Sequence, residues 1–246
     1  MVYKQMAYVY DKFMADAPYD EWVHFTQSIL GDRQIKRIAD LGCGTGEISI
    51  RLRELGFEII GLDYSEDMLT YAASKANEKN VSITWLHQDL TEMEGLEGID
   101  LAISYCDVIN YITDKAQIKE VFRRTYNSLN QSGMFIFDVH SIFQVEQNYK
   151  NQTFADVLED MSYIWFCSEG EETGEMFHDL TFFVLDNGKY VRFDEYHHER
   201  TYPISFYKKT LKEVGFTNIK VYADFSLEPE HLHDQSERIF FVAEKT

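Results

Sequence analysis

Three aspartates and a set of glycines stand where a nucleotide-bearing cofactor could be bound. Asp40, Asp63 and Asp89 each end, or nearly end, an apolar run of the sequence. The glycines follow the first aspartate at every second position: Gly42, Gly44 and Gly46. Glycine weakens a regular element, so this spacing predicts a loop whose backbone approaches a ligand closely. If the runs are parallel strands, the three acids line one crevice, where open α/β sheets bind ligands.

The glycine spacing disagrees with the loops that bind a pyrophosphate. A dinucleotide loop has the pattern G-x-G-x-x-G, whereas Glu47 stands where its third glycine or alanine would fall. A phosphate-binding P-loop needs a lysine that is absent after these glycines. The carboxylate of Asp40 beside a glycine turn instead suits the cationic amino group of an amino acid.

The other two aspartates suit the remaining parts of such a ligand. Asp63 could accept hydrogen bonds from both hydroxyls of a ribose, as the acid at the end of the second strand does in nucleotide folds. Asp89 could accept from the exocyclic amine of adenine, while Leu90 packs on the ring. Amino acid, ribose and adenine together describe S-adenosylmethionine.

The same segments carry a family resemblance. "ADLGCGTGEIS" (39–49), "GLDYSEDML" (61–69) and "HQDL" (87–90) resemble class I S-adenosylmethionine-dependent methyltransferases. The resemblance implies a Rossmann-like α/β fold with a seven-stranded sheet in the order 3-2-1-4-5-7-6, its last strand antiparallel. It also implies that the glycine loop, with Cys43, lies by the methionine part of the cofactor. Tyr64 and Met68 would pack near the adenine or ribose.

The N-terminal segment adds a second resemblance. "YVYDKFMADAPYDEW" (8–22) is similar to the start of a bacterial group of such enzymes without assigned substrate, in which this arm folds over the cofactor. The resemblance makes Tyr10 a pocket residue, and Tyr19 and Trp22 further candidates. The alternative is that these aromatic side chains form the core-facing side of an amphipathic helix, and the spacing from Tyr19 to Ile29 fits one.

Strand and helix patterns alternate along most of the chain. Apolar runs predict strands at 35–42, 57–63, 81–89, 99–105 and 133–140. Helical patterns lie between them, at 46–56, 65–80 and 114–129. The alternation favours a parallel sheet with helices on both faces. Ser65 is expected to cap the second of these helices.

The pattern divides the chain into an arm, a core and an insertion. Residues 1–34 read as a helical arm and 35–145 as the cofactor-binding core. Between 150 and 202, strand-like runs follow one another without a helix, which predicts an antiparallel β insertion that acts as a substrate lid. A helix at 205–215 and strands at 216–225 and 238–245 return to the core, so that 203–246 completes a single methyltransferase domain.

The substrate is expected over the end of the fourth predicted strand, beside the cofactor. Tyr105 and Cys106 are assigned to the cofactor there, and Asn110 and Tyr111 to the substrate. Asp107 is a candidate catalytic residue, although it and Asn110 could also cap the following helix. His140, at the end of the fifth strand, is the second catalytic candidate; an ordinary loop histidine is the alternative. On the insertion, three residues share one strand face and could cover the substrate: Tyr196, His198 and Arg200.

The composition limits the kinds of partner that the protein is expected to bind. The 246 residues carry 42 Asp and Glu against 23 Lys and Arg, a net charge of −19, with no basic patch for a phosphate backbone. The three cysteines have no CxxC spacing, and "HLHD" (231–234) is expected to be solvated, so no metal site is indicated. No signal peptide or membrane-spanning run is apparent, which predicts a cytoplasmic protein. No feature specifies an oligomer.

These observations predict an enzyme that transfers a methyl group from S-adenosylmethionine to a small molecule by in-line displacement. Such a reaction mainly needs alignment and exclusion of water, so a strong base is optional. Two alternatives remain open from the sequence: an RNA or protein methyltransferase that acts with a partner, and a non-catalytic protein that binds the cofactor.

Overall fold

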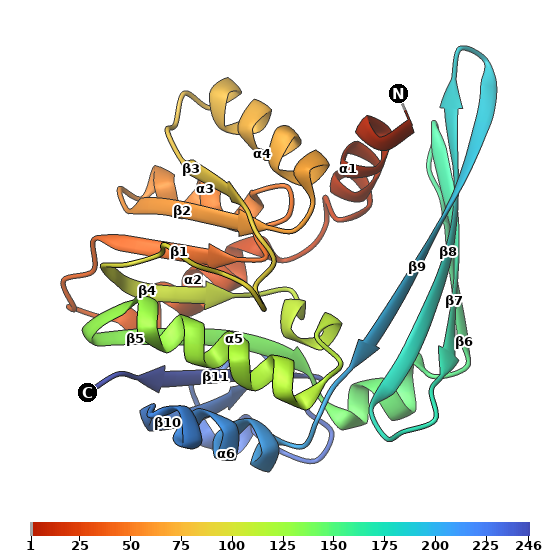
Figure 1. The fold of residues 1–246 in the computed structure, drawn as a ribbon. Coiled ribbons are helices and arrows are strands. Elements are labelled where there is room, and N and C mark those ends of the chain that lie inside the picture. The colour runs from red at the N-terminus through yellow and green to blue at the C-terminus, as the bar shows by residue number, and fades with distance from the viewer. Residues whose placement is uncertain (1) are drawn as a thin grey trace.

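A mixed seven-stranded sheet forms the centre of the computed structural model, which describes residues 2–246 (Figure 1). Its first five strands along the chain are parallel, and the next-to-last position is filled by an antiparallel strand from the C-terminus. In spatial order the strands are β3 (Thr84–His87), β2 (Glu58–Asp63), β1 (Arg37–Leu41), β4 (Ile99–Ser104), β5 (Leu129–His140), β11 (Arg238–Glu244) and β10 (Thr217–Ala223). This is the order expected from the resemblance, so the predicted fold class is confirmed.

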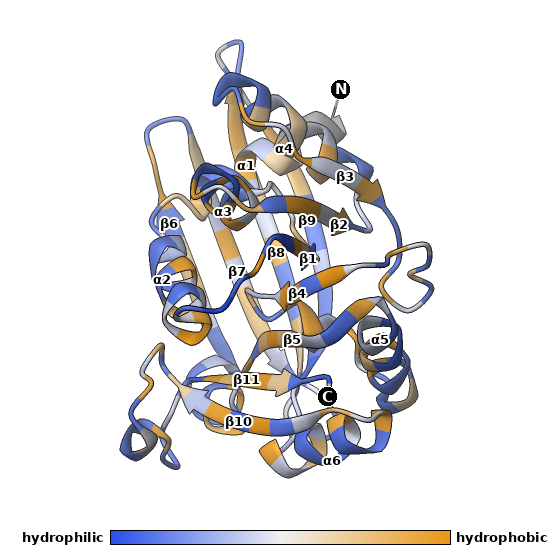
Figure 2. Ribbon diagram, turned by 90° about the vertical axis from the view of Figure 1, so that its left-hand side faces the viewer, coloured by the Kyte–Doolittle hydropathy of each residue, from blue (hydrophilic) through white to orange (hydrophobic). Residues whose placement is uncertain are grey.

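Helices cover both faces of this sheet because its buried side chains alternate. Along β5, Phe135 and Phe137 face one side, while Met134 and Ile136 face the other. The first side packs against α5 (Lys115–Ser128) and α6 (Ile204–Val214). The second packs against α2 (Tyr19–Leu30) and α3 (Glu47–Glu54). Figure 2 shows the resulting pattern, with apolar stretches along β4, β5 and β11 and mixed polarity along α5 and α6.

Short side-chain caps fix where two helices begin. Ser65 accepts a hydrogen bond from the Met68 N–H at the start of α4 (Glu66–Glu78), which packs on β2 and β3. The predicted cap of α4 is therefore confirmed. Asp114 accepts from the backbone N–H groups of Ala116 and Gln117 and starts α5.

A separate four-stranded antiparallel sheet faces the carboxyl ends of the parallel strands (Figure 1). It consists of β6 (Gln152–Val157), β7 (Met161–Glu169), β8 (Glu175–Asp186) and β9 (Lys189–Arg200), in that order. The last three match the predicted strands, whereas β6 and the preceding π-helical turn η2 (Gln144–Tyr149) carry no clear sequence signal. We call this four-stranded sheet the lid sheet.

The first helix, α1 (Val2–Phe13), lies between α4 and the lid sheet (Figure 1). Its Phe13 ring packs edge-on against Tyr163 of β7, with centroids 4.6 Å apart. Val9 is buried against Met161 and Phe182 of the lid sheet. The arm therefore joins the two sheets. Two short turns, η1 (Val108–Tyr111) and η3 (Pro229–His231), complete the described elements, and no helix among residues 2–246 is long and apolar enough to cross a membrane.

Candidate active site

A cavity of about 810 Å³ lies where the carboxyl ends of β1, β2, β4 and β5 meet α1 and the inner face of the lid sheet. Parallel strands present their carboxyl ends at one edge of the sheet, so the loops after them meet there. The residues that line the cavity include all three aspartates singled out in the sequence: Asp40, Asp63 and Asp89.

The glycine loop shapes one wall of the cavity. Gly42 and Cys43 both donate backbone hydrogen bonds to the carbonyl of Leu62, which holds the loop against β2. Gly42 has φ +82°, and a Cβ there would lie 2.4 Å from Val108, so no other residue fits. Gly44 has φ +52°, and a Cβ there would meet no protein atom within 4 Å. The loop thus leaves open space in front of Gly44, inside the cavity.

Gly46 does not line the cavity, contrary to the expectation that it contacts the cofactor. It stands at the start of α3 with φ +79°, where a Cβ would lie 2.8 Å from the Trp85 ring and 3.1 Å from Ala72. Glycine is required at this position because α3 packs closely against α4 and β3.

Asp63 links the glycine loop to the loop that follows β2. Its Oδ2 accepts the N–H of Gly44 and its Oδ1 the N–H of Ser65, each at 2.8 Å. Burial raises the pKa of Asp63, and these backbone hydrogen bonds oppose the rise. The carboxylate is consequently held in one orientation at the cavity wall.

Asp40 is buried behind the glycine loop, with 3% of its surface exposed. Its Oδ2 accepts a hydrogen bond of 2.7 Å from Ser49. Burial raises the pKa of Asp40 to about 7, although the Ser49 hydrogen bond lowers it. This carboxyl group therefore changes charge near neutral pH, at a cavity that could receive a cation.

The remaining predicted cofactor residues also line the cavity. Asp89 accepts hydrogen bonds from the N–H and hydroxyl of Thr91, while Leu90 is buried beside it. Tyr64 is 75% exposed at the rim. The others in the cavity wall are Tyr10, Cys43, Met68, Tyr105 and Cys106.

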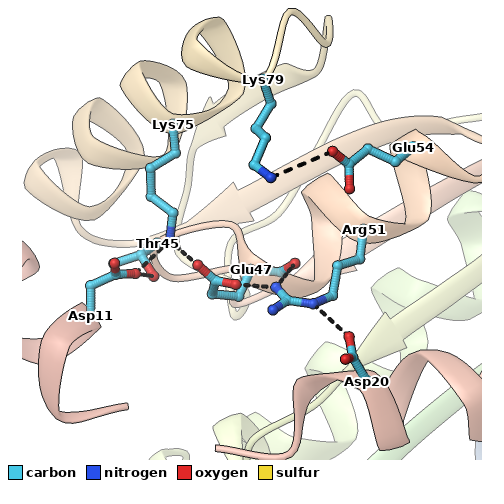
Figure 3. Close-up of polar contacts among 8 residues, drawn as sticks. All are labelled: Asp11, Asp20, Thr45, Glu47, Arg51, Glu54, Lys75 and Lys79. Carbon is cyan, nitrogen blue, oxygen red and sulfur yellow. Dashed lines mark hydrogen bonds and ion pairs between the residues drawn. The ribbon is translucent and has the colours of Figure 1, made fainter. Parts of the chain in front are cut away.

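Charged groups fasten the N-terminal arm beside the glycine loop (Figure 3). Asp11 of α1 accepts a hydrogen bond of 2.8 Å from the Thr45 hydroxyl and pairs with Lys75 of α4 at 2.5 Å. Lys75 also pairs with Glu47 at the start of α3, and Glu47 pairs with Arg51. We call Asp11, Thr45, Glu47 and Lys75 the clasp. It ties α1 to α3 and α4 while Tyr10 lines the cavity.

Trp22, in contrast, belongs to the core. It is 3% exposed, and its indole N–H donates to Asp138 Oδ2 at 2.7 Å. Tyr19 is also buried, but it reaches the cavity wall. The two aromatic residues of α2 thus divide between the alternatives that the sequence left open.

Asp107, after β4, and His140, at the end of β5, meet in the cavity wall. The Nε2 atom of His140 lies 3.3 Å from Asp107 Oδ1, and Arg238 Nη1 lies 3.0 Å from the same oxygen. Burial alone would raise the pKa of Asp107, but His140 and Arg238 outweigh it and hold that pKa well below its usual range. Asp107 precedes η1 without capping it through its side chain. No sequence pattern pointed to Arg238.

Asn110 does not line the cavity, contrary to its assignment to the substrate. It is fully buried, its Oδ1 accepts the backbone N–H of His140, and its Nδ2 donates to the carbonyl of Arg200. It joins the ends of β5 and β9 to η1. Tyr111, the other residue assigned to the substrate in this segment, does line the cavity.

The residues expected to cover the substrate from the insertion lie on the wrong face of β9. Tyr196 stacks on Phe177, His198 pairs with Glu175 at 2.9 Å, and Arg200 pairs with Glu172. All of these point away from the cavity. Successive side chains of a strand alternate, so the residues between them face inward. The inward residues of the lid sheet include His178, Glu195, His197 and Glu199.

Comparison with known proteins assigns the chain to a class. Residues 38–133 match the model of a family described as "Methyltransferase domain". Two relatives are named "Putative methyltransferase", one from Geobacillus sp. (strain WCH70) and one from Bacillus subtilis (strain 168). They are 42% and 43% identical to this chain, and the matches cover all of this chain and 100% and 98% of the relatives. The chain belongs to the class I S-adenosylmethionine-dependent methyltransferases, in a bacterial group without assigned substrate, and S-adenosylmethionine is its cofactor.

Other relatives are more distant. A glycine/sarcosine N-methyltransferase of Aphanothece halophytica is 24% identical, with 87% of this chain and 77% of that protein covered. The crystal structure of an S-adenosylmethionine-dependent methyltransferase from Clostridium acetobutylicum has a TM-score of 0.88 at 28% identity and 99% coverage of both chains. A sugar N-methyltransferase from Streptoalloteichus sp. shares the fold, with a TM-score of 0.79 at 16% identity and coverage of 96% and 92%.

Proposed function

We propose that this methyltransferase acts on a small molecule, held between the cofactor and the lid sheet. The proposal rests on one cavity of about 810 Å³, whose two opposite walls come from different parts of the fold. One wall comes from the glycine loop and the strand ends, and the other from inward residues of β8 and β9. Pockets for small ligands span about 300–1,000 Å³, so this cavity is large enough for a cofactor and a small acceptor together.

The cofactor occupies the first wall in this proposal. The open space at Gly44 takes the methionine part, and Asp40 faces its amino group. Asp63, already oriented by two backbone N–H groups, accepts the ribose hydroxyls. Asp89 accepts from the adenine amine, with Leu90 against the ring.

Bound S-adenosylmethionine supplies a methyl group on a positively charged sulfur. The protein contributes alignment and exclusion of water, which are the main requirements of an in-line displacement. Residues 150–202 act as the substrate lid, because their inner face closes the cavity opposite the strand ends. The arm closes the cofactor end through the clasp (Figure 3).

A small acceptor agrees with the names of the relatives and with the charge of the chain. The glycine/sarcosine and sugar enzymes are named for small substrates. The net charge of −19 disfavours a nucleic-acid phosphate backbone. Three free thiols favour the reducing cytoplasm as the place of reaction.

The test is a methyl-acceptor screen with labelled S-adenosylmethionine and small metabolites, read by mass spectrometry. We expect one chemical class of small molecule to gain the label, and Asp63→Ala to lower the transfer by roughly 10- to 150-fold at limiting cofactor. Labelling of tRNA or a protein extract instead, with RNA binding that falls steeply with salt, would support the partner-dependent alternative. Tight cofactor binding with no acceptor in either screen would support a non-catalytic role.

A further inference from the structure

Glu199 is a buried carboxylate with an unused acceptor. It lies on the inward face of β9 in the cavity wall, and its side chain is 5% exposed. Among the described residues, its Oε2 atom has no hydrogen-bond partner. A buried charged oxygen without a partner is costly, so such an atom in a ligand cavity indicates a donor supplied by the ligand.

The neighbouring histidine serves only the other oxygen of Glu199, Oε1. The indole N–H of Trp165, which can only donate, lies 2.8 Å from Nδ1 of His178. That nitrogen must therefore accept, and the proton of the neutral ring is on Nε2. Nε2 lies 3.2 Å from Glu199 Oε1 and donates to it. His178 thus donates to Oε1 and leaves Oε2 of Glu199 without a donor.

Two more acceptor groups converge on the same point. One ligand atom each from Asp107, His140 and Glu199 lies within 4.8 Å of the others. Since no two of these atoms are more than 4.8 Å apart, and Asp107 and His140 approach to 3.3 Å, a single donor group can lie within about 2.8 Å of all three, which is hydrogen-bond distance. A primary ammonium group carries three N–H donors. The three acceptors therefore match it in number, distance and charge.

The surroundings favour an organic cation over a metal ion. Of the residues that line the cavity, seven are carboxylates and one is an arginine. That arginine, Arg238, pairs with Asp107 and Asp138, and among the described residues no arginine or lysine pairs with Glu199. Aromatic rings in the cavity wall adjoin this cluster and suit an ammonium group through cation–π attraction. Tyr149 packs against His140, and Trp165 packs against His178, the neighbour of Glu199.

We propose that the methyl acceptor is an amine, bound as its ammonium ion by Glu199 and Asp107 and deprotonated by His140. The proposal rests on the function proposed above and names the substrate class of that site. Glu199 supplies most of the selectivity for the cation, since its Oε2 gains its missing donor only when the amine is bound.

The reaction then balances in two steps. The ammonium N–H proton passes to an unprotonated ring nitrogen of His140, and Asp107 stabilises the resulting imidazolium. The freed lone pair of nitrogen forms a bond to the methyl carbon, while the carbon–sulfur bond breaks and its electron pair stays on sulfur. The products are the methylated ammonium ion and S-adenosylhomocysteine. The two carboxylates keep the other N–H groups in place.

Binding of three matched probes tests the proposal without turnover. Benzylamine, benzyl alcohol and benzoate share a ring and differ in charge, and calorimetry with the S-adenosylhomocysteine complex gives their affinities. We expect benzylamine to bind best and Glu199→Gln to weaken it by roughly 10- to 150-fold, the range for a hydrogen bond to a charged group. Benzyl alcohol should change by less than threefold in that variant. Asp194→Asn is the matched control, because Asp194 lies on the outward face of β9.

Fold is monitored by the affinity of each variant for S-adenosylhomocysteine, which should stay within twofold. If Glu199→Gln does not fold, Glu199→Asp is the second variant. It keeps the carboxylate but shortens the side chain by one methylene, so the affinity for benzylamine should also fall. Equal binding of the three probes, or no effect of Glu199 on the amine, would refute the proposal. Binding that requires Mn²⁺ or Mg²⁺ and is lost with EDTA would refute it in favour of a metal site.

Turnover separates the roles of the residues. With an amine acceptor, His140→Gln should lower kcat at nearly constant KM, and Glu199→Gln should mainly raise KM. If no amine is methylated although benzylamine binds through Glu199, the binding site stands and the proposed function fails. If alcohols or carboxylates are methylated, the function stands and the amine inference fails.

Discussion

Asp40 should make the affinity for the cofactor depend on pH. Replacing Asp40 should abolish that pH dependence. In the folded protein burial raises the pKa of this carboxyl group to about 7, so it is mostly protonated at pH 6 and mostly ionised at pH 8. Only the ionised form attracts the amino group of the methionine part. Affinity for S-adenosylhomocysteine should therefore rise with pH and level off above 7.

The magnitude follows from that pKa. With a value of about 7, the ionised fraction of Asp40 falls by about tenfold between pH 8 and pH 6, so the affinity should fall by about the same factor. At pH 6 binding should release about one proton. In Asp40→Asn the affinity at pH 8 should drop by roughly 10- to 150-fold, and the pH dependence should disappear.

Calorimetry at pH 6, 7 and 8 in buffers with different ionisation enthalpies measures both quantities. Ser49→Ala is an informative second variant. Its hydroxyl lowers the pKa of Asp40, so its loss should move the midpoint to higher pH. A parallel fall in affinity for the wild type and Asp40→Asn would refute the reasoning, because another group would then carry the titration.

Three further variants test the cofactor wall, the packing beneath it and the arm. Asp63→Ala should weaken S-adenosylhomocysteine by about 1.5–3 kcal/mol in calorimetry, and unchanged affinity would exclude the ribose contact. Gly61→Ala should cost about 1–3 kcal/mol in urea unfolding, because its Cβ would lie 2.5 Å from the Trp85 ring; adding Trp85→Leu should restore part of the loss. Lys75→Met should break the clasp and raise the dissociation rate of S-adenosylhomocysteine about tenfold in stopped-flow measurements. Lys79→Met, which removes only an exposed pair with Glu54, should leave that rate unchanged (Figure 3).

The core of the fold and the cofactor wall could be predicted because local signals agree there. Each parallel strand is an apolar run, the first three have an aspartate at or close to their ends, and each helix between them has its own periodicity. Asp40, Asp63 and Asp89 meet because parallel strands present their ends at one edge. Gly46 shows the limit of such a motif: its positive φ and its contact with Trp85 serve packing, and a spacing pattern does not separate packing from binding.

The antiparallel lid sheet was predicted, but which of its residues face the cavity was not, for a physical reason. Alternation of polar and apolar residues identifies the buried face of a strand only when the other face meets water. On β9 both faces are polar, since Glu195 and Glu199 face a cavity while Tyr196 and His198 face outward. Periodicity therefore indicates that β9 is a strand but does not indicate which residues face the substrate. Arg238 was missed because it pairs with Asp107, 131 residues away in the sequence.

The alternation of the lid sheet also separates two kinds of evolutionary change. On β8 and β9, inward residues pair across the strands, as His178 does with His197 and Phe182 with Phe193. A substitution at such a position alters the cavity facing the acceptor and leaves the glycine loop and the three aspartates untouched. The inner face of the lid sheet can thus change without altering the glycine loop or the three aspartates. A laboratory library restricted to these inward positions would be a compact route to altered methylation selectivity.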